Sequence, residues 1–245
     1  MTTPSAPARL RLGMITPSSN TSLEPMTAML LAGTPQITAH YARIRVTEIT
    51  IGAKGLAQFD ATPMLDAVSL LADMRPQAIV WNGTSGGWRG LEADRQLCRT
   101  LEDHTGIATT TMTLALVDLL RRKQFKRIAF VTPYTDDVQA RILETFTDEG
   151  FECSTSPCLG ISENFAFATV ADAALDEMAS RAAADRPDVI LPFCTNLAAA
   201  KLALGWEQRY GIPVFDSIAM AARAGIELAG GSASSITGFG SIFAD

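Results

Sequence analysis

Short apolar runs along the chain alternate with longer stretches in which apolar residues recur every three or four positions. The short runs predict buried strands, and the longer stretches predict amphipathic helices. Because strands and helices alternate, we expect an α/β fold of mostly parallel sheets flanked by helices. The predicted strands are residues 10–16, 37–46, 78–81, 107–111, 127–132, 189–193 and 213–215.

Three of the predicted helices have recognisable boundaries. Thr62 followed by Pro63 is typical of a helix start, because threonine caps a helix and proline suits its first turn. A second helix is expected to begin after Thr135 and to stop at Gly150, with its apolar residues on one face. Residues 171–184 predict a third helix.

The chain also carries an internal repeat. The run RPQAIVWNGTS at residues 75–85 recurs as RPDVILPFCTN at residues 186–196. RLGMITPSSN at residues 11–20 recurs as RIAFVTPYTD at residues 127–136, and a weaker echo, TGI and YGI, keeps the same order. Echoes in one order at nearly constant spacing predict two duplicated, pseudo-symmetric α/β lobes.

The repeat suggests how the lobes divide the chain. We expect an N-terminal lobe over residues 1–115, a C-terminal lobe over residues 116–225, and a last segment, residues 226–245, that packs back on the N-terminal lobe. Ligands of α/β sheets bind beyond the carboxyl ends of the strands. If the lobes face each other, four such loops meet in one cleft, which is the expected active site. The loops are residues 16–20, 82–85, 132–136 and 193–196.

Composition narrows the function. The 245 residues are 47% hydrophobic and 19% charged, which is typical of a globular protein. A net charge of −6 without a basic block argues against nucleic acid or an anionic membrane surface as partners. No apolar run is long enough to span a membrane, and residues 1–11 lack the apolar core of a signal peptide. We expect a cytoplasmic protein whose partners are small molecules and, in a homo-oligomer, copies of itself.

Side chains that bind metals or act as nucleophiles are few. The four cysteines show no paired spacing and there are two histidines, so we expect reduced thiols, no metal, no cofactor and no Ser-His-Asp triad. The cysteines are Cys98, Cys153, Cys158 and Cys194, and the histidines are His40 and His104.

Superposing the repeats pairs Gly83 with Cys194, so one side of the expected cleft has a thiol and the other has no side chain. A free cysteine at a strand end is often only a core residue. The polar Thr195 and Asn196 that follow it, and the glycine opposite, favour a catalytic thiol. Tyr134, in the facing loop, is either a loop-packing residue or part of the site.

Hydroxyl and amide side chains fill the rest of the expected cleft and suit carboxylate or enolate oxygens, as an oxyanion hole does. Thr84 and Ser85 also suit the start of a helix, and that role is compatible with binding. Asn164 is either a helix-start residue or a ligand. The remaining candidates are Ser18, Ser19, Asn20, Thr132, Thr195 and Asn196.

At these residues the sequence resembles the aspartate/glutamate racemase superfamily, and within it the arylmalonate decarboxylases and maleate cis-trans isomerases, from residue 12 to about residue 243. The resemblance implies two lobes, each with a cysteine at a strand end, facing each other across the substrate. Here Gly83 stands at the first cysteine position. The run GTS at residues 83–85, followed by WRG at residues 88–90, is similar to the decarboxylase pattern, in which glycine replaces that cysteine.

The resemblance also implies roles for single residues. In the decarboxylases, the residues that match Thr84 and Ser85 bind a carboxylate, and the tyrosine that matches Tyr134 donates to a dioxyanion hole. Cys194 matches their single catalytic cysteine. Thr195 departs from the pattern, because the decarboxylases have glycine at that position, and the departure bears on the width of the pocket.

The N-terminal loop resembles the isomerases instead. The run PSSNT that begins at Pro17 is similar to their motif, in which the asparagine that matches Asn20 holds a substrate carboxylate. Asn164 resembles a second isomerase carboxylate ligand. The isomerase mechanism uses the first cysteine as a nucleophile on the double bond, and Gly83 cannot replace that cysteine.

The leading hypothesis is cofactor-independent decarboxylation of a substituted malonate, such as an arylmalonate, through an enediolate that Cys194 protonates. The first alternative is a maleate-isomerase-like enzyme that acts through Cys194 alone. A racemase would need a second acid-base group, which Gly83 does not supply. The last alternative is a module that binds carboxylates without catalysis. The two leading hypotheses imply a small dicarboxylic acid as substrate.

Overall fold

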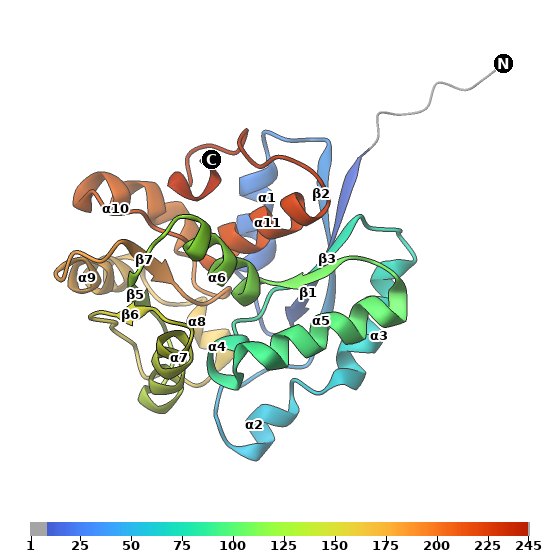
Figure 1. Cartoon of the computed structure of the whole chain (residues 1–245), viewed down its shortest axis with the longest axis horizontal. Coiled ribbons are helices and arrows are strands. Elements are labelled where there is room, and N and C mark those ends of the chain that lie inside the picture. Colours follow the sequence, from blue (N-terminus) through green and yellow to red (C-terminus); the bar gives the residue numbers. More distant parts are fainter. Residues whose placement is uncertain (1–8, 245) are drawn as a thin grey trace.

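Two parallel sheets, one in each half of the chain, organise the molecule (Figure 1). The computed structural model describes residues 9–244. The first sheet has the order β2-β1-β3-β4 and the second the order β6-β5-β7, with every neighbouring pair parallel. The expected α/β fold with two lobes is confirmed. The strands are β1 (Leu10–Pro17), β2 (Ile37–Ile44), β3 (Ala78–Trp81), β4 (Thr109–Thr111), β5 (Arg127–Val131), β6 (Glu152–Cys153) and β7 (Val189–Pro192).

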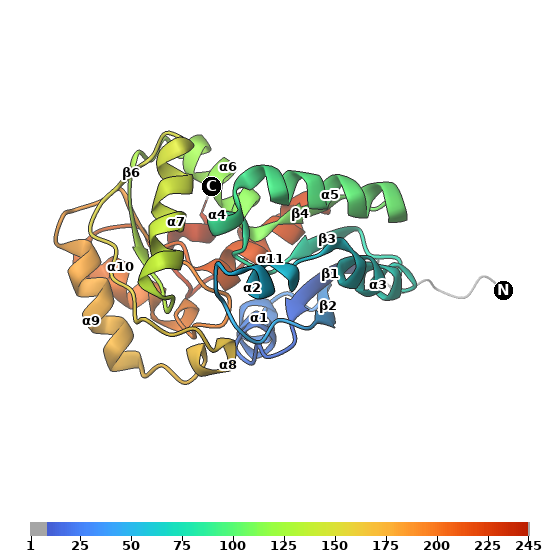
Figure 2. The same ribbon diagram turned by 90° about the horizontal axis from the view of Figure 1, so that it is seen from below.

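Helices flank both sheets (Figure 2). In the N-terminal half they are α1 (Leu23–Leu31), α2 (Ala53–Ala57), α3 (Ala61–Ala72), α4 (Gly86–Arg89), α5 (Leu91–Thr105) and α6 (Met112–Arg122). In the C-terminal half they are α7 (Asp136–Asp148), α8 (Asn164–Phe167), α9 (Asp172–Ala183), α10 (Ala203–Tyr210) and α11 (Ser217–Leu228). Helix α3 packs on β1 and β2, and α9 packs on β5 and β7. The buried apolar side chains of the strands therefore form the core beneath these helices.

The duplication is visible in the backbone. Arg75 and Arg186 occupy equivalent places in the repeat, and both have a positive φ, 51° and 49°, just before a proline. Gly106 and Gly211 end α5 and α10 in the left-handed conformation, with φ of 69° and 66°. A left-handed residue that ends a helix is most often glycine, because glycine has no Cβ to clash. The equivalent helices of the two lobes therefore end in the same backbone conformation.

A pair of glutamates repeats in the same way. The Glu102 carboxylate accepts a hydrogen bond from the Thr109 N–H at 2.8 Å, and Glu207 accepts one from the Val214 N–H at 2.8 Å. Val214 therefore occupies the place that β4 has in the first sheet. The expected strand at residues 213–215 is reduced there to a single parallel bridge between Val214 and Ile190.

Several boundaries differ from expectation. The strand predicted to end at Val46 ends at Ile44, because the Val46 N–H donates to the Ser18 hydroxyl and not to the sheet. Helix α3 begins at Ala61 with Asp60 as its N-cap, two residues earlier than the predicted cap at Thr62. Pro63 is its third residue, where the missing N–H would have had no helical partner. Strand β6 was not expected, because two residues are too few to show a period.

The predicted helices α7 and α9 lie where the sequence placed them, within one or two residues. Helix α11 contacts β1, β3 and β4 of the first sheet as well as α1 and α6, so the chain returns to the N-terminal half by Ser217. Near the end of the chain, the Arg223 guanidinium donates to the Ile242 carbonyl. The boundaries at residues 115 and 225 stay a prediction, and most of residues 1–11 fall outside the described range.

No helix within residues 9–244 is both long and apolar enough to cross a membrane.

Candidate active site

The four predicted loops contact one another across the two halves of the chain. The Thr84 and Tyr134 hydroxyls lie 2.6 Å apart, and the Thr195 hydroxyl donates to the Asn82 carbonyl at 2.7 Å. The Asn20 amide donates to the Thr195 carbonyl at 2.9 Å. Eight of the side chains predicted as site residues are each 1–5% exposed, so the two halves of the chain bury this group between them. They are Asn20, Thr84, Ser85, Tyr134, Asn164, Cys194, Thr195 and Asn196.

Cys194 lies two residues after Pro192, the last residue of β7, in the loop at the carboxyl end of the strand. Its sulfur accepts a hydrogen bond from the Asn196 N–H at 3.4 Å. Burial raises the pKa of the Cys194 thiol to about 12, and a hydrogen bond from Tyr134 opposes this effect without cancelling it. Desolvation disfavours the charged form of a thiol, so Cys194 stays protonated at neutral pH.

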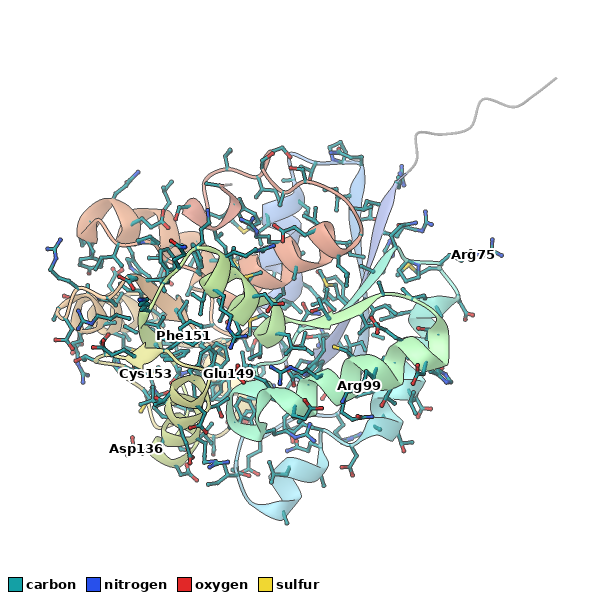
Figure 3. The ribbon with its side chains drawn as sticks, viewed as in Figure 1. Arg75, Arg99, Asp136, Glu149, Phe151 and Cys153 are labelled. Atoms are coloured by element: carbon teal, nitrogen blue, oxygen red, sulfur yellow. The ribbon has the colours of Figure 1, made fainter. Side chains whose placement is uncertain are left out.

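Among the other cysteines, Cys98 is buried in α5 and Cys158 donates to Asp136 at 3.2 Å. Cys153 ends β6 on the outer side of the C-terminal half (Figure 3). Of the four, only Cys194 belongs to the four loops. Among the residues that the structure describes, no three His, Cys, Asp or Glu side chains are grouped as metal ligands.

Tyr134 is fixed by aromatic packing. Its ring makes edge contacts with Trp88 and Phe167, with centroids 5.4 and 5.5 Å away. Burial raises the pKa of Tyr134 well above its usual value, so its hydroxyl is neutral. This neutral hydroxyl, held 2.6 Å from the Thr84 hydroxyl, is a group of fixed position that is able to donate a hydrogen bond, as an oxyanion hole requires.

Ser85 and Trp81 are coupled. Ser85 occupies the position before α4, but its side chain makes no capping hydrogen bond. Its oxygen accepts a hydrogen bond from the indole Nε1–H of Trp81 at 3.1 Å. Because the oxygen accepts, the Ser85 O–H remains a donor for a ligand.

Gly83 cannot carry a side chain in this structure. A Cβ at Gly83 would lie 2.1 Å from the nearest atom of the Trp81 indole. That distance is far below any contact between carbon atoms. The two lobes therefore differ by more than one missing thiol, because the Trp81 indole fills the space that a side chain at position 83 would need.

The two asparagines of the isomerase resemblance are engaged with the protein. The Asn20 side-chain oxygen accepts from the N–H groups of Ser22 and Leu23, while its amide donates to Thr195. The Asn164 amide donates to the Ser19 hydroxyl at 2.9 Å. In this closed form both amides join the halves of the chain.

Two further predictions concern the N-terminal loop. Pro17 is the buried last residue of β1, and its carbonyl accepts from the Asn20 N–H at 3.1 Å, which shapes the turn. Ser18, which the repeat pairs with Tyr134, was expected to line the cleft. It is exposed instead, and its hydroxyl accepts from Val46. The register of the loop therefore turns this side chain outward.

One contact between two irregular segments was not predicted from the sequence. Glu48 and Glu163 form an antiparallel bridge, and the Ile49 N–H donates to the Ser162 carbonyl at 2.8 Å. This pairing brings Asn164 to the N-terminal loop. Irregular segments show no hydrophobic period, so the sequence carried no signal for it.

A family comparison decides where the chain belongs. The family model for arylmalonate decarboxylase matches residues 12–243. The chain belongs to the arylmalonate decarboxylase family. That model spans both lobes and all four loops, which agrees with the resemblance seen in the motifs.

The proteins similar to this chain are named for two different activities. The chain is 32% identical to arylmalonate decarboxylase of Bordetella bronchiseptica over 158 residues, which are 64% of this chain and 66%, just under two thirds, of that protein. It is 27% identical to maleate isomerase of Alcaligenes faecalis over 219 residues, 84% of this chain and 86% of that protein. A liganded double mutant of arylmalonate decarboxylase superposes with a TM-score of 0.86 at 27% identity, over 96% of this chain and 99% of that chain.

Proposed function

We propose that the protein is a cofactor-independent decarboxylase of a substituted malonate, with Cys194 as the proton donor. The observation that carries the proposal is the one-sided site. A neutral thiol lies on one side, and Gly83 covered by Trp81 lies on the other. The family and the arylmalonate decarboxylase relative support this assignment.

In the proposed reaction, the hydroxyls of Thr84, Ser85 and Tyr134 bind the carboxylate that stays. The bond from the α-carbon to the other carboxylate breaks, carbon dioxide leaves, and the electron pair enters an enediolate. The same donors stabilise the enediolate oxygens, which carry more negative charge than the starting carboxylate. Cys194 gives its proton to the α-carbon, and the thiolate takes a new proton from solvent.

The protonation state of Cys194 favours this reaction over nucleophilic addition. A proton donor must hold its proton at working pH, whereas an adding nucleophile must be a thiolate. A thiol whose pKa is raised to about 12 by burial meets the first requirement. Within residues 9–244, no cationic side chain is among the groups that shift the pKa of Cys194.

Maleate-isomerase-like activity is the second candidate, and one observation favours it. The Asn20 amide touches Thr195, the residue after Cys194, so on opening it could turn to a substrate carboxylate beside the thiol. The maleate isomerase relatives match more of the chain than the decarboxylase does. Such an enzyme would act with Cys194 alone, because position 83 is a glycine.

A substrate panel separates the candidates. The purified protein is incubated with phenylmalonate, methylmalonate, maleate and aspartate, and the products are followed by NMR. We expect carbon dioxide and a monocarboxylic acid from a malonate, and no fumarate from maleate. Fumarate formation without decarboxylation would overturn the proposal in favour of the isomerase, and no turnover would favour a binding module.

The variant Cys194→Ser tests whether the reaction depends on the thiol. The fold should be retained, and turnover should fall by at least about 100-fold, because an alcohol is far less acidic than a thiol. Cys98→Ser is the matched control, since Cys98 is also buried but lies in α5, outside the four loops. Turnover at the wild-type rate in Cys194→Ser would remove this residue from the mechanism.

A further inference from the structure

Trp81 lies beside the site, two residues before Gly83. It ends β3 and is completely buried, and its ring makes an edge contact with Phe59 at a centroid distance of 6.3 Å. Its Nε1–H donates to Ser85. Complete burial, the contact with Phe59 and the hydrogen bond to Ser85 therefore hold the ring, and it cannot swing away at low cost.

The edge of this ring that carries Nε1 covers Gly83. A Cβ at Gly83 would lie 2.1, 2.3 and 2.7 Å from the atoms Cζ2, Cε2 and Nε1 of Trp81. Separations below 3.0 Å require one group to move. A leucine at position 81 would have none of these three atoms, so the conflict comes from the indole and not from the backbone.

Gly83 also faces the thiol. Its neighbour Asn82 accepts the hydrogen bond from Thr195, the residue after Cys194. Its other neighbour, Thr84, has its hydroxyl 2.6 Å from the Tyr134 hydroxyl, and Tyr134 is close enough to Cys194 to influence the pKa of the thiol. Position 83 thus lies across the contact between the lobes from the Cys194 side chain.

We propose that Trp81 determines the one-sidedness of this site, because its indole fills the place of a second acid-base side chain opposite Cys194 and must be shortened before any such group can work there. The proposal rests on the proposed function, since it assumes that the substrate's α-carbon lies between positions 83 and 194. Trp81 is then a specificity-determining residue, because glycine in place of the first cysteine does not by itself account for the one-sided site.

The consequence concerns a thiol introduced by Gly83→Cys. With both thiols facing the substrate, the introduced one, as thiolate, removes the α-proton of a monocarboxylic acid and the electron pair enters the enediolate. Cys194 then donates its proton to the opposite face and becomes the thiolate. The reverse sequence restores both groups, so the acid exchanges its α-proton and racemises. With Trp81 in place, the introduced thiol cannot reach this position.

The test compares wild type with Gly83→Cys, Trp81→Leu, and the double variant Trp81→Leu/Gly83→Cys. Trp206→Leu/Gly83→Cys is the matched control, because Trp206 is a buried tryptophan of the C-terminal half that donates to Asp176, away from the site. One enantiomer of 2-phenylpropionate is incubated in heavy water with each variant. Deuterium at the α-carbon and optical purity are then measured.

We expect the Trp81→Leu/Gly83→Cys variant to exchange the α-proton at least about tenfold faster than Gly83→Cys, and the Trp206 control to match Gly83→Cys. Equal exchange in Gly83→Cys and in the double variant would overturn the proposal, and so would a folded double variant that does not exchange. Each variant's circular dichroism and Tm establish that it is folded.

A second measurement does not depend on any substrate. Gly83→Ala adds only the Cβ, so it should lower Tm by several degrees in the wild-type background and by clearly less in the Trp81→Leu background. Equal losses in both backgrounds would overturn the proposal. If wild type decarboxylates no malonate, the proposed function fails, while this thermal comparison still decides whether Trp81 occupies the position.

Discussion

At the scale of single residues, burial decides what Cys194 can do. The thiol lies at a strand end beside Asn196, in a place where water does not reach it. Desolvation is the largest influence on its pKa and outweighs the hydrogen bond from Tyr134. The result is a thiol that holds its proton, which is the opposite of the activation found in nucleophilic cysteines.

This environment predicts the pH dependence of turnover. Because the pKa of Cys194 is raised to about 12, the thiol remains protonated as pH rises through the usual range of thiols, about 8.5. We therefore expect kcat to stay level from about pH 8 to about pH 10. The check is a kcat profile together with the thiolate absorbance of wild type minus Cys194→Ser. A fall in kcat with its midpoint at the ordinary thiol pKa would contradict the expected desolvation.

Tyr134→Phe tests the hydroxyl that joins Thr84 to the thiol. Removing one oxyanion donor should lower kcat by about 10- to 1000-fold, with a smaller change in KM, because the lost hydrogen bond strengthens as the enediolate forms. Tyr210→Phe, at the end of α10, is the control. An unchanged kcat in folded Tyr134→Phe would place the hydroxyl outside the reaction.

At the scale of secondary structure elements, the helix α11 begins with an unusual cap. Asp216 is fully buried, and one of its oxygens accepts from the N–H groups of Ile218 and Ala219. Burial raises the pKa of Asp216 from 3.8 to about 7, and the two hydrogen bonds only partly oppose this. The cap stabilises the helix, while its charge is unfavourable in this place.

The cap predicts a dependence of stability on pH. Because the folded-state pKa exceeds the unfolded value, the stabilising contribution is complete below about pH 4 and is lost as pH rises through about 7. Asp216→Asn keeps the accepting oxygen but has no charge, so its free energy of unfolding should lack this decline. Urea unfolding of both proteins at several pH values measures it.

Asp216→Ala serves as the control for the cap itself. It removes the accepting oxygen, so it should be less stable than Asp216→Asn at every pH, by about 0.5–2 kcal/mol. Parallel stability curves for wild type and Asp216→Asn between pH 4 and pH 8 would show that the pKa of the Asp216 carboxyl is not raised by folding.

At the scale of the whole molecule, asparagine side chains close the two halves on the site. The Asn196 side-chain oxygen accepts from the N–H groups of Thr21 and Ser22, and its amide donates to the Asn164 carbonyl at 2.6 Å. Because Cys194 is only 3% exposed, a substrate or reagent reaches it only when the residues that cover it move, and we expect the Asn196 contacts to oppose that movement.

Asn196→Ala should therefore favour the open form. Asn196→Ala removes two hydrogen bonds to the N-terminal half, worth about 1 kcal/mol each, so labelling of Cys194 by iodoacetamide should accelerate roughly 30-fold. Mass spectrometry of the labelled peptide gives the rate, and Cys98, buried within α5, provides the internal control. An unchanged labelling rate at Cys194 would show that opening does not involve this contact.

The sequence alone determined the architecture, because hydrophobic period and repetition are local patterns. Alternating strands and helices predicted the α/β fold, and the echo of residues 75–85 in residues 186–196 predicted two equivalent lobes. The same echo placed Gly83 opposite Cys194. Helix-boundary signals worked where they were strong, as at Thr135, and failed by two residues at Thr62, because Asp60 and not Thr62 is the N-cap of α3.

Tertiary structure decided what no local pattern contains. Whether Ser18 points inward or outward depends on how its loop meets Val46, and whether Asn20 is free or engaged depends on a contact with Thr195, 175 positions away. The raised pKa of Cys194 follows from burial by both halves together. The sequence shows the glycine at position 83, but only the packing of the Trp81 ring over it shows that nothing larger fits, because steric exclusion is a property of atoms brought together by the fold.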